Sequence, residues 1–246
     1  MFQFGMDKRV IYVIMAVLVI ISLRGYLTNT AELLNLLLTI PAVLIAITFH
    51  EFAHAFAADK LGDNTPRSQG RLTLNPFAHI DIVGFALLIA AGFGWGKPVQ
   101  INPVKFKRNI SMTQGEAIVS VAGPLMNFIL AFVFTILYFC VFKFEWYANM
   151  SIQAFTLIMQ FLTALISINV GLGVFNLIPL PPLDGEKIFR NILPYNAIQW
   201  LDRNSGTLQI IFMVLWITGL LGYVVSPIVQ FLFKWLFVGV GMILGL

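Results

Sequence analysis

The feature that most constrains this chain is a series of apolar runs about as long as a bilayer is thick. One run, ELLNLLLTIPAVLIAITF, fills most of residues 31–61, and comparable runs fill residues 116–142 and 152–177. An α-helix needs about 20 apolar residues to cross roughly 30 Å of hydrocarbon. Only 11% of the residues are charged and 59% are hydrophobic, whereas about a quarter are charged in soluble proteins. We therefore predict an integral membrane protein.

The spacing of these runs predicts an all-α polytopic membrane protein with about six transmembrane helices in a single integral membrane domain, residues 1–246. The first run is preceded by basic residues like a signal peptide, but no small-x-small cleavage site follows it, so we expect a retained anchor. The expected helices are 8–24, 31–61, 116–142, 152–177, 208–224 and 227–244, the last two lying within residues 207–245.

Residues 62–114 fit no single membrane-spanning helix. They are rich in proline and glycine around one short apolar run, DIVGFALLIAAGFGW. We predict a re-entrant or hairpin segment between the second and third helices, with an extended or hairpin piece at GKPVQINPV, where prolines disfavour helix. Non-helical backbone at membrane depth must lie against protein or a wet cavity.

The basic residues predict the orientation. With a cytoplasmic N-terminus, twelve of the 15 Lys and Arg residues fall on the cytoplasmic face, Arg24 and Lys143 fall on the other, and Lys234 lies in the last helix. This bias follows the positive-inside rule. We expect a multi-pass protein of the cell inner membrane with cytoplasmic termini and a cytoplasm-facing site. The net charge of +4 then reflects topology in the lipid bilayer, and no nucleic-acid partner is expected.

A candidate metal site ends the second run at His50-Glu51-Phe52-Ala53-His54. Residues four apart on a helix share a face, so His50 and His54 can both present imidazole nitrogens to one Zn²⁺. Glu51 lies at a neighbouring position, where it could activate a zinc-bound water. The bare pattern HExxH often occurs by chance, but ionisable residues at membrane depth are costly and favour a function.

A catalytic zinc usually has three protein ligands, and neither a third histidine nor a helical glutamate follows HExxH at the usual spacing. Asp59 and Asp63 follow the helix so closely that we expect them at a solvated helix end. Asp184 is favoured, because the prolines of NLIPLPPLDG break the fourth helix before it and Gly185 permits a tight turn. The candidates for the third ligand are His79, Asp59, Asp63, Asp81 and Asp184.

The motifs HEFAHAFAADKLGD, GRLTLNPFAHIDIVG, GWGKPVQINP, AGPLMNF and NLIPLPPLDG resemble, in order and spacing, those of the site-2 proteases, which are intramembrane zinc metalloproteases. The resemblance covers residues 31–190, the expected catalytic core, and is to the compact bacterial branch without a PDZ or CBS domain. It implies that His50, His54 and Asp184 bind a single zinc ion and that Glu51 activates water. Gln100 stands where a second proline is expected.

The resemblance also implies roles for three further residues. Asn127, in AGPLMN, is expected near the active site in contact with the substrate or the oxyanion. Asn176 is expected either to shape the loop before Asp184 or to stabilise the broken helix. His79 is expected to be a structural hydrogen-bonding residue or to support the site, with the third-ligand role as its alternative.

The expected function is that of an intramembrane zinc metalloendopeptidase that hydrolyses peptide bonds in or near transmembrane segments. Transmembrane proteins such as anti-sigma factors or membrane-tethered precursors are the expected substrates. GWGKPVQINP could pair edge to edge with an unwound substrate, or it could simply pack against the core. The alternatives are a membrane metal-ion transporter, which does not require Glu51 beside His50, and a noncatalytic scaffold, which would use four closed ligands.

Overall fold

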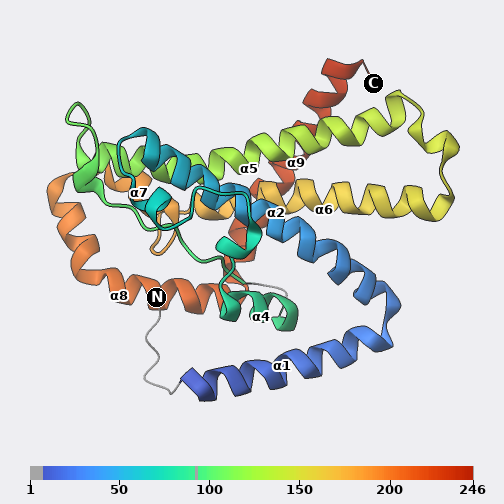
Figure 1. Cartoon of the computed structure of the whole chain (residues 1–246), viewed down its shortest axis with the longest axis horizontal. Helices are drawn as coiled ribbons and strands as arrows, with labels where there is room; N and C mark the ends of the chain where they lie inside the picture. The colour runs from blue at the N-terminus through green and yellow to red at the C-terminus, as the bar shows by residue number, and fades with distance from the viewer. Residues whose placement is uncertain (1–7, 92–93, 246) are drawn as a thin grey trace.

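The computed structural model describes residues 8–91 and 94–245 (Figure 1). Helices dominate, and no strand occurs among the residues described, so the all-α prediction is confirmed. The α-helices are α1 (Lys8–Thr28), α2 (Thr30–Lys60), α3 (Thr65–Ser68), α4 (Ile82–Ala91), α5 (Met112–Lys143), α6 (Ile152–Asn176), α7 (Asp184–Arg190), α8 (Tyr195–Ile217) and α9 (Leu220–Leu244). Three short 3-10 helices, η1 (Pro76–Ala78), η2 (Pro103–Lys105) and η3 (Trp146–Asn149), lie in the connections.

The core lies where α2, α5, α6 and α9 meet. α5 and α6 run antiparallel side by side, with α2 packed against both (Figure 1). Ala42 of α2, Val141 of α5 and Leu162 of α6 belong to one buried cluster. A second cluster contains Ala131 of α5 and Ile166 of α6, and apolar residues of α9 pack against it. This packing fixes α2, which carries HExxH, relative to α5 and α6.

Four helices of the described chain are long and apolar enough to cross a membrane: α2, α5, α6 and α9. This agrees with the prediction of a polytopic membrane protein. α1 and α8 are not among the four, so the predicted count of six is not confirmed within the described residues. In α8 the charged residues Asp202 and Arg203 lie in the first half of the helix, which shortens its apolar stretch.

The predicted division between the last two helices is wrong, although the predicted end at Leu244 is confirmed. They were expected at 208–224 and 227–244, but α8 ends at Ile217 and α9 begins at Leu220. The break lies at Gly219, whose φ of 74° is a left-handed conformation that glycine adopts without steric cost. Pro227 lies inside α9. The apolar sequence continues across the break, so hydropathy does not locate it.

The segment between α2 and α5 contains one short apolar helix and irregular backbone. α4 has 10 residues and is about 15 Å long, half the thickness of the hydrocarbon core. Its last carbonyls accept hydrogen bonds from α1, from Ser22 Oγ to Ala90 (2.9 Å) and from the Tyr26 hydroxyl to Ile89 (3.2 Å). Among the described residues of this segment the β-pairing is one isolated bridge, between Ile80 and Gly96, so no paired hairpin is seen there.

Candidate metal centre

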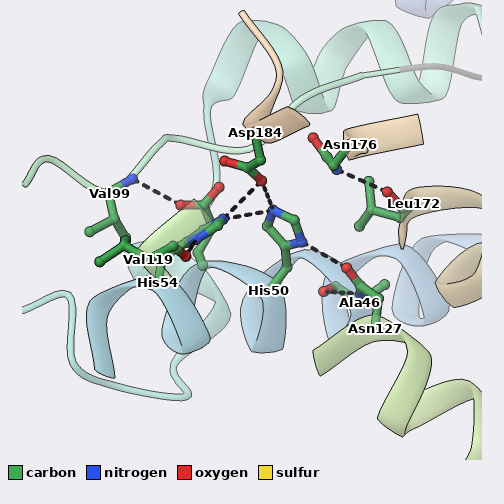
Figure 2. Close-up of polar contacts among 10 residues, drawn as sticks. Ala46, His50, His54, Val99, Val119, Asn127, Leu172, Asn176 and Asp184 are labelled. Carbon is green, nitrogen blue, oxygen red and sulfur yellow. Dashed lines mark hydrogen bonds and ion pairs between the residues drawn. The ribbon is translucent and has the colours of Figure 1, made fainter. Parts of the chain in front are cut away.

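Two histidines one turn apart on α2 face the same point. His50 and His54 are 5% and 7% exposed, and their Nε2 atoms lie 3.0 Å apart. Figure 2 shows both imidazoles directed toward Asp184. The structure therefore brings the two histidines of HExxH together, as their spacing predicts.

Asp184 reaches the same point from another part of the chain. α6 ends at Asn176, and the proline-rich residues 177–183 lead into α7, of which Asp184 is the first residue. Its Oδ2 lies 3.1 Å from Nε2 of His50 and 3.1 Å from Nε2 of His54 (Figure 2). The favoured third ligand of the sequence analysis thus completes a group of three donor atoms.

Glycine is required directly after Asp184. A Cβ at Gly185 would come within 2.4 Å of the carbonyl oxygens of Leu177 and Ile178. These carbonyls belong to the end of α6 and the proline-rich turn, so Gly185 lets α7 start against them. The short turn that results places Asp184 beside α2.

Two further contacts determine which imidazole nitrogen carries the proton. His54 Nδ1 lies 2.7 Å from the carbonyl oxygen of Val119, which can only accept a hydrogen bond. His50 Nδ1 lies 2.7 Å from Oδ1 of Asn127, which also accepts. Both Nδ1 atoms are therefore the donors. In the neutral imidazoles both Nε2 atoms direct a lone pair toward Asp184.

This arrangement suits a zinc ion. Three lone-pair donors, the Nε2 atoms of His50 and His54 and Oδ2 of Asp184, converge within 3.0–3.1 Å, where they repel one another unless a cation lies between them. In a tetrahedral site with zinc–ligand bonds of about 2.0–2.1 Å, ligand atoms are about 3.3 Å apart. Two histidines and a carboxylate also leave a fourth position open, as catalytic zinc sites do.

Gly123 lets α5 approach the imidazoles. A Cβ at this position would lie 2.4 Å from Nε2 of His54 and 2.6 Å from Cε1 of His50. Only a glycine at this point of α5 leaves room for both rings. The sequence analysis did not identify Gly123, although it lies in the AGPLMN motif.

Asn127 of α5 lies behind His50 and is fully buried. Its Nδ2 donates to the carbonyl of Ala46 (3.1 Å) and to Oδ1 of Asn169 (2.9 Å). Both of its amide hydrogens are therefore used, and its Oδ1 accepts from His50 (Figure 2). This geometry favours support of His50 over the expected contact with substrate or oxyanion, because no donor remains for a substrate oxygen.

Asn169 was missed by the sequence analysis. It lies on α6, is fully buried, and donates to the carbonyl of Leu165 at 2.8 Å while accepting from Asn127. The available signal was an amide side chain within an apolar helix, which in a membrane must find a polar partner.

Glu51 is held by the backbone of the loop before α5. Its Oε2 accepts a hydrogen bond from the amide of Val99 at 2.8 Å. No hydrogen bond from the described residues reaches its Oε1. One carboxylate oxygen is thus oriented by the protein and the other is left for chemistry. Because the donor is a backbone amide, no side chain in the sequence indicated it.

Two of the other candidate ligands have different roles. Asp59 pairs with Arg67 at 2.8 Å. Asp81 Oδ1 accepts the amides of Val83 and Gly84 at the start of α4. Neither belongs to the group formed by the two histidines and Asp184.

The expectation that Asp63 lies at a solvated helix end is wrong. Asp63 is fully buried, and its two oxygens accept the amides of Thr65 (2.9 Å) and Asn102 (2.6 Å). The carboxylate turns inward because α2 ends at Lys60 and the following turn directs the chain back against the loop before α5.

His79 and Asn176 contribute hydrogen bonds to their own segments. His79 is fully buried, and its Nε2 donates to the carbonyl of Thr73 at 2.8 Å. Burial lowers the pKa of His79, although this hydrogen bond opposes the effect. Asn176 Nδ2 donates to the carbonyl of Leu172 at 3.0 Å, within its own helix (Figure 2). These contacts favour a structural hydrogen-bonding role for His79 and stabilisation of the broken helix by Asn176.

Four helices of membrane-spanning length and a buried His–His–Asp group beside a glutamate define a membrane metalloprotein with a metallopeptidase-type site. The chain belongs to peptidase family M50, the family of the site-2 proteases, whose model matches residues 38–219. The match extends past residue 190, the expected end of the catalytic core.

Three relatives carry the provisional name of zinc metalloprotease. YwhC of Bacillus subtilis is 39% identical over 189 residues, which are 76% of this chain and 84% of that protein. Rip2 of Mycolicibacterium smegmatis is 34% identical over 61% of this chain and 54% of its own length. MJ0611 of Methanocaldococcus jannaschii is 29% identical over 81% of this chain and 90% of that protein. No solved structure matches the chain.

Proposed function

We propose that this protein is an intramembrane zinc metalloendopeptidase that hydrolyses peptide bonds in or near transmembrane segments. The observation that carries the proposal is the convergence of His50, His54 and Asp184 beside Glu51, at one end of a helix apolar enough to cross a membrane. The membership of family M50 and the names of the relatives support it. Zinc is the cofactor that fits the donor set.

The chemistry divides between the bound ion and the residues of the chain. When held by His50, His54 and Asp184, zinc supplies a Lewis acid that polarises a carbonyl group and lowers the pKa of a water molecule. Glu51 uses Oε1 to accept the proton of that water as its oxygen attacks the scissile carbonyl carbon. The same carboxyl group then gives the proton to the leaving amine. Asn127 keeps His50 in the tautomer that directs Nε2 to the ion.

The substrate must be unwound before attack, because a helix engages its peptide groups in its own hydrogen bonds. Loop residues 97–102 contact Glu51 through Val99, so a strand docked along their outer edge would run past the base. The amide of Gln100 forms no hydrogen bond within the described part of the chain and is available for such pairing. Single-span membrane proteins, such as anti-sigma factors or membrane-tethered precursors, are the proposed substrates.

We also propose an inner-membrane location, with the N-terminus and the site toward the cytoplasm. The predicted cytoplasmic C-terminus and sixth crossing do not fit the structure, because Lys143 Nζ donates to the carbonyl of Leu244 at 2.6 Å, and Lys143 at the end of α5 lies on the predicted non-cytoplasmic face. α1 would provide a crossing beyond α2, α5, α6 and α9, and α4 would be re-entrant. Twelve basic residues on one face support this orientation. Cys140 is the only cysteine, so single cysteines placed in a Cys140→Ser background can be labelled from either side of the membrane to test it.

Substitution of the proposed base tests the function. In Glu51→Gln, the amide cannot accept a proton but preserves the size of the side chain, so we expect zinc content to be retained and cleavage to be abolished. The purified protein is reconstituted in liposomes with a single-span peptide that carries a fluorophore and a quencher on either side of the span. Glu32→Gln, at an exposed position of the same helix, is the matched control.

The outcomes separate the three functions. Retained zinc with lost cleavage supports the peptidase. Zinc without cleavage by the unmodified protein would favour a noncatalytic scaffold. Zinc flux across the liposomes that Glu51→Gln does not affect would favour a transporter.

A further inference from the structure

Loop residues 97–102 bring the Val99 amide to Glu51. A buried arginine holds one end of this loop by hydrogen bonds. Arg71 is only 5% exposed, and its guanidinium donates to the carbonyls of Ala78 and Lys97. Burying a guanidinium is costly unless it is hydrogen-bonded or paired. No carboxylate within salt-bridge distance of Arg71 occurs among the described residues. Its charge is thus used to hold backbone carbonyls.

The other end of the loop is fastened by a buried carboxylate. Asp63 accepts the amide of Asn102 at 2.6 Å and that of Thr65 at 2.9 Å. It lies in the turn just after α2, which ends at Lys60, and the Lys107 amide donates to the carbonyl of Leu61 at 2.8 Å nearby. The turn after the helix that carries Glu51 therefore carries the residue that anchors Asn102.

Between these anchors the loop has little freedom. The amide of Lys97 donates to the carbonyl of His79 at 2.8 Å, and its carbonyl accepts from Arg71. Val99 lies two residues further on and donates to Glu51. Burial lowers the pKa of Arg71 and the negative charge of Glu51 opposes this effect, so the arginine and the base also attract each other.

We propose that Arg71 and Asp63 are positioning residues for Glu51. They fix loop residues 97–102 at both ends, so that the Val99 amide holds Oε2 of Glu51 and leaves Oε1 facing the attacking water. This inference rests on the proposed function. This role explains why Arg71 and Asp63 are buried, although neither binds zinc or substrate. Releasing either end lets the loop move and misaligns the base.

Three pairs of variants test the inference in the full-length protein. Arg71→Met and Asp63→Ala release the two ends of the loop. Arg67→Met and Asp59→Ala are the matched controls. Each of these two residues lies four positions before the residue that it matches, and the two form an ion pair with each other. Val99→Pro removes the amide that binds Glu51, and Val99→Ala retains it. Arg71→Lys and Asp63→Asn keep part of the hydrogen bonding and serve where the larger changes impair folding.

Cleavage of the fluorogenic single-span peptide is measured together with zinc content and hydrogen exchange of the peptide 96–102. We expect Arg71→Met, Asp63→Ala and Val99→Pro to lower kcat by about tenfold to hundredfold, since small misplacements of catalytic groups have effects of this size. KM and zinc content should change little, and the control variants should stay within about twofold of the unmodified protein. Arg71→Lys should recover part of the loss. Exchange in 96–102 should quicken in Arg71→Met and Asp63→Ala, while α5 exchanges as before.

Two results would overturn the inference. One is full kcat in Val99→Pro and Arg71→Met with zinc bound. The other is unchanged exchange of 96–102 in Arg71→Met and Asp63→Ala. Failure of the proposed function would give a different result, because the unmodified protein would then cleave the peptide no faster than Glu51→Gln does. Hydrogen exchange of residues 96–102 would still show whether Arg71 and Asp63 hold the loop.

Discussion

His50 is fixed from both sides of its ring. Nε2 faces Asp184 and His54, while Nδ1 donates to Asn127, which is in turn held by Asn169 and the Ala46 carbonyl. Partners of the second ring nitrogen orient a metal-binding histidine and set its tautomer. The two asparagines therefore belong to the metal site although neither is placed to bind the ion.

Loss of either asparagine should weaken zinc binding. Asn127→Leu removes the acceptor for His50, and Asn169→Leu removes the acceptor that orients Asn127. Loss of such partners typically lowers metal affinity by about tenfold to hundredfold. We expect this range for Asn127→Leu and a smaller effect for Asn169→Leu, measured by competition with a fluorescent zinc chelator. Asn127→Asp retains an acceptor and should keep zinc.

Thr135→Val provides the control for these asparagine variants. Thr135 is fully buried on the same helix as Asn127 but donates only to the carbonyl of Ala131. Its replacement should leave zinc affinity unchanged. The cobalt-substituted proteins offer a second measure, because the visible spectrum of Co²⁺ reports ligand geometry. Unaltered affinity and an unaltered spectrum in Asn127→Leu would contradict the supporting role of Asn127.

The sequence predicted the residues whose side chains carry the chemistry better than those that hold them. His50, Glu51 and His54 share a spaced motif, and Asp184 follows a distinctive run of prolines. Asn169 and the Val99 amide have no such pattern, because their roles depend on which segments pack together. A buried carboxylate such as Asp63 is misread for the same reason, since its partner amide belongs to Asn102.

At the scale of elements, His79 in the loop before α4 makes the free energy of unfolding depend on pH. Burial lowers the pKa of His79 below its ordinary value of 6.5, so the unfolded chain binds a proton there more readily than the folded protein does. The free energy of unfolding should therefore be greatest above about pH 6.5 and decline as the pH falls toward the folded-state pKa.

This prediction is checked by comparing melting temperatures at about pH 7.5 and pH 5.5 in detergent. His79→Gln retains a donor for the Thr73 carbonyl but does not titrate, so it should lose less stability on acidification than the unmodified protein. The other two histidines are present in both proteins and cancel in the comparison. Equal losses in the two proteins would exclude His79 as the source of the pH dependence.

Helix limits show where hydropathy succeeds and where it fails. α2 and α6 were predicted to within one residue, because Lys60 and the prolines after Asn176 give clear signals at their ends. The division between α8 and α9 was misplaced, because it depends on the left-handed conformation of Gly219 in a continuous apolar run. The helix boundary there is set by the backbone conformation of one residue, which hydropathy does not reveal.

At the scale of the whole molecule, the metal centre joins segments that are distant in sequence. α2 provides two donor atoms and the base, α7 provides the third donor, and α5 and α6 provide the residues behind His50. The core clusters between α2, α5, α6 and α9 hold these parts in register. Asp184 is the ligand on which the closure of the site depends, because it comes from outside HExxH.

The zinc content of Asp184→Ala tests the central claim most directly. The unmodified protein, purified and dialysed against a weak chelator, should retain about one zinc ion per chain, and Asp184→Ala should lose it, because two histidines alone do not complete a zinc site. Asp202→Ala is the control, since Asp202 is an exposed carboxylate paired with Arg190, and it should retain the ion. Full zinc occupancy in Asp184→Ala would contradict the account.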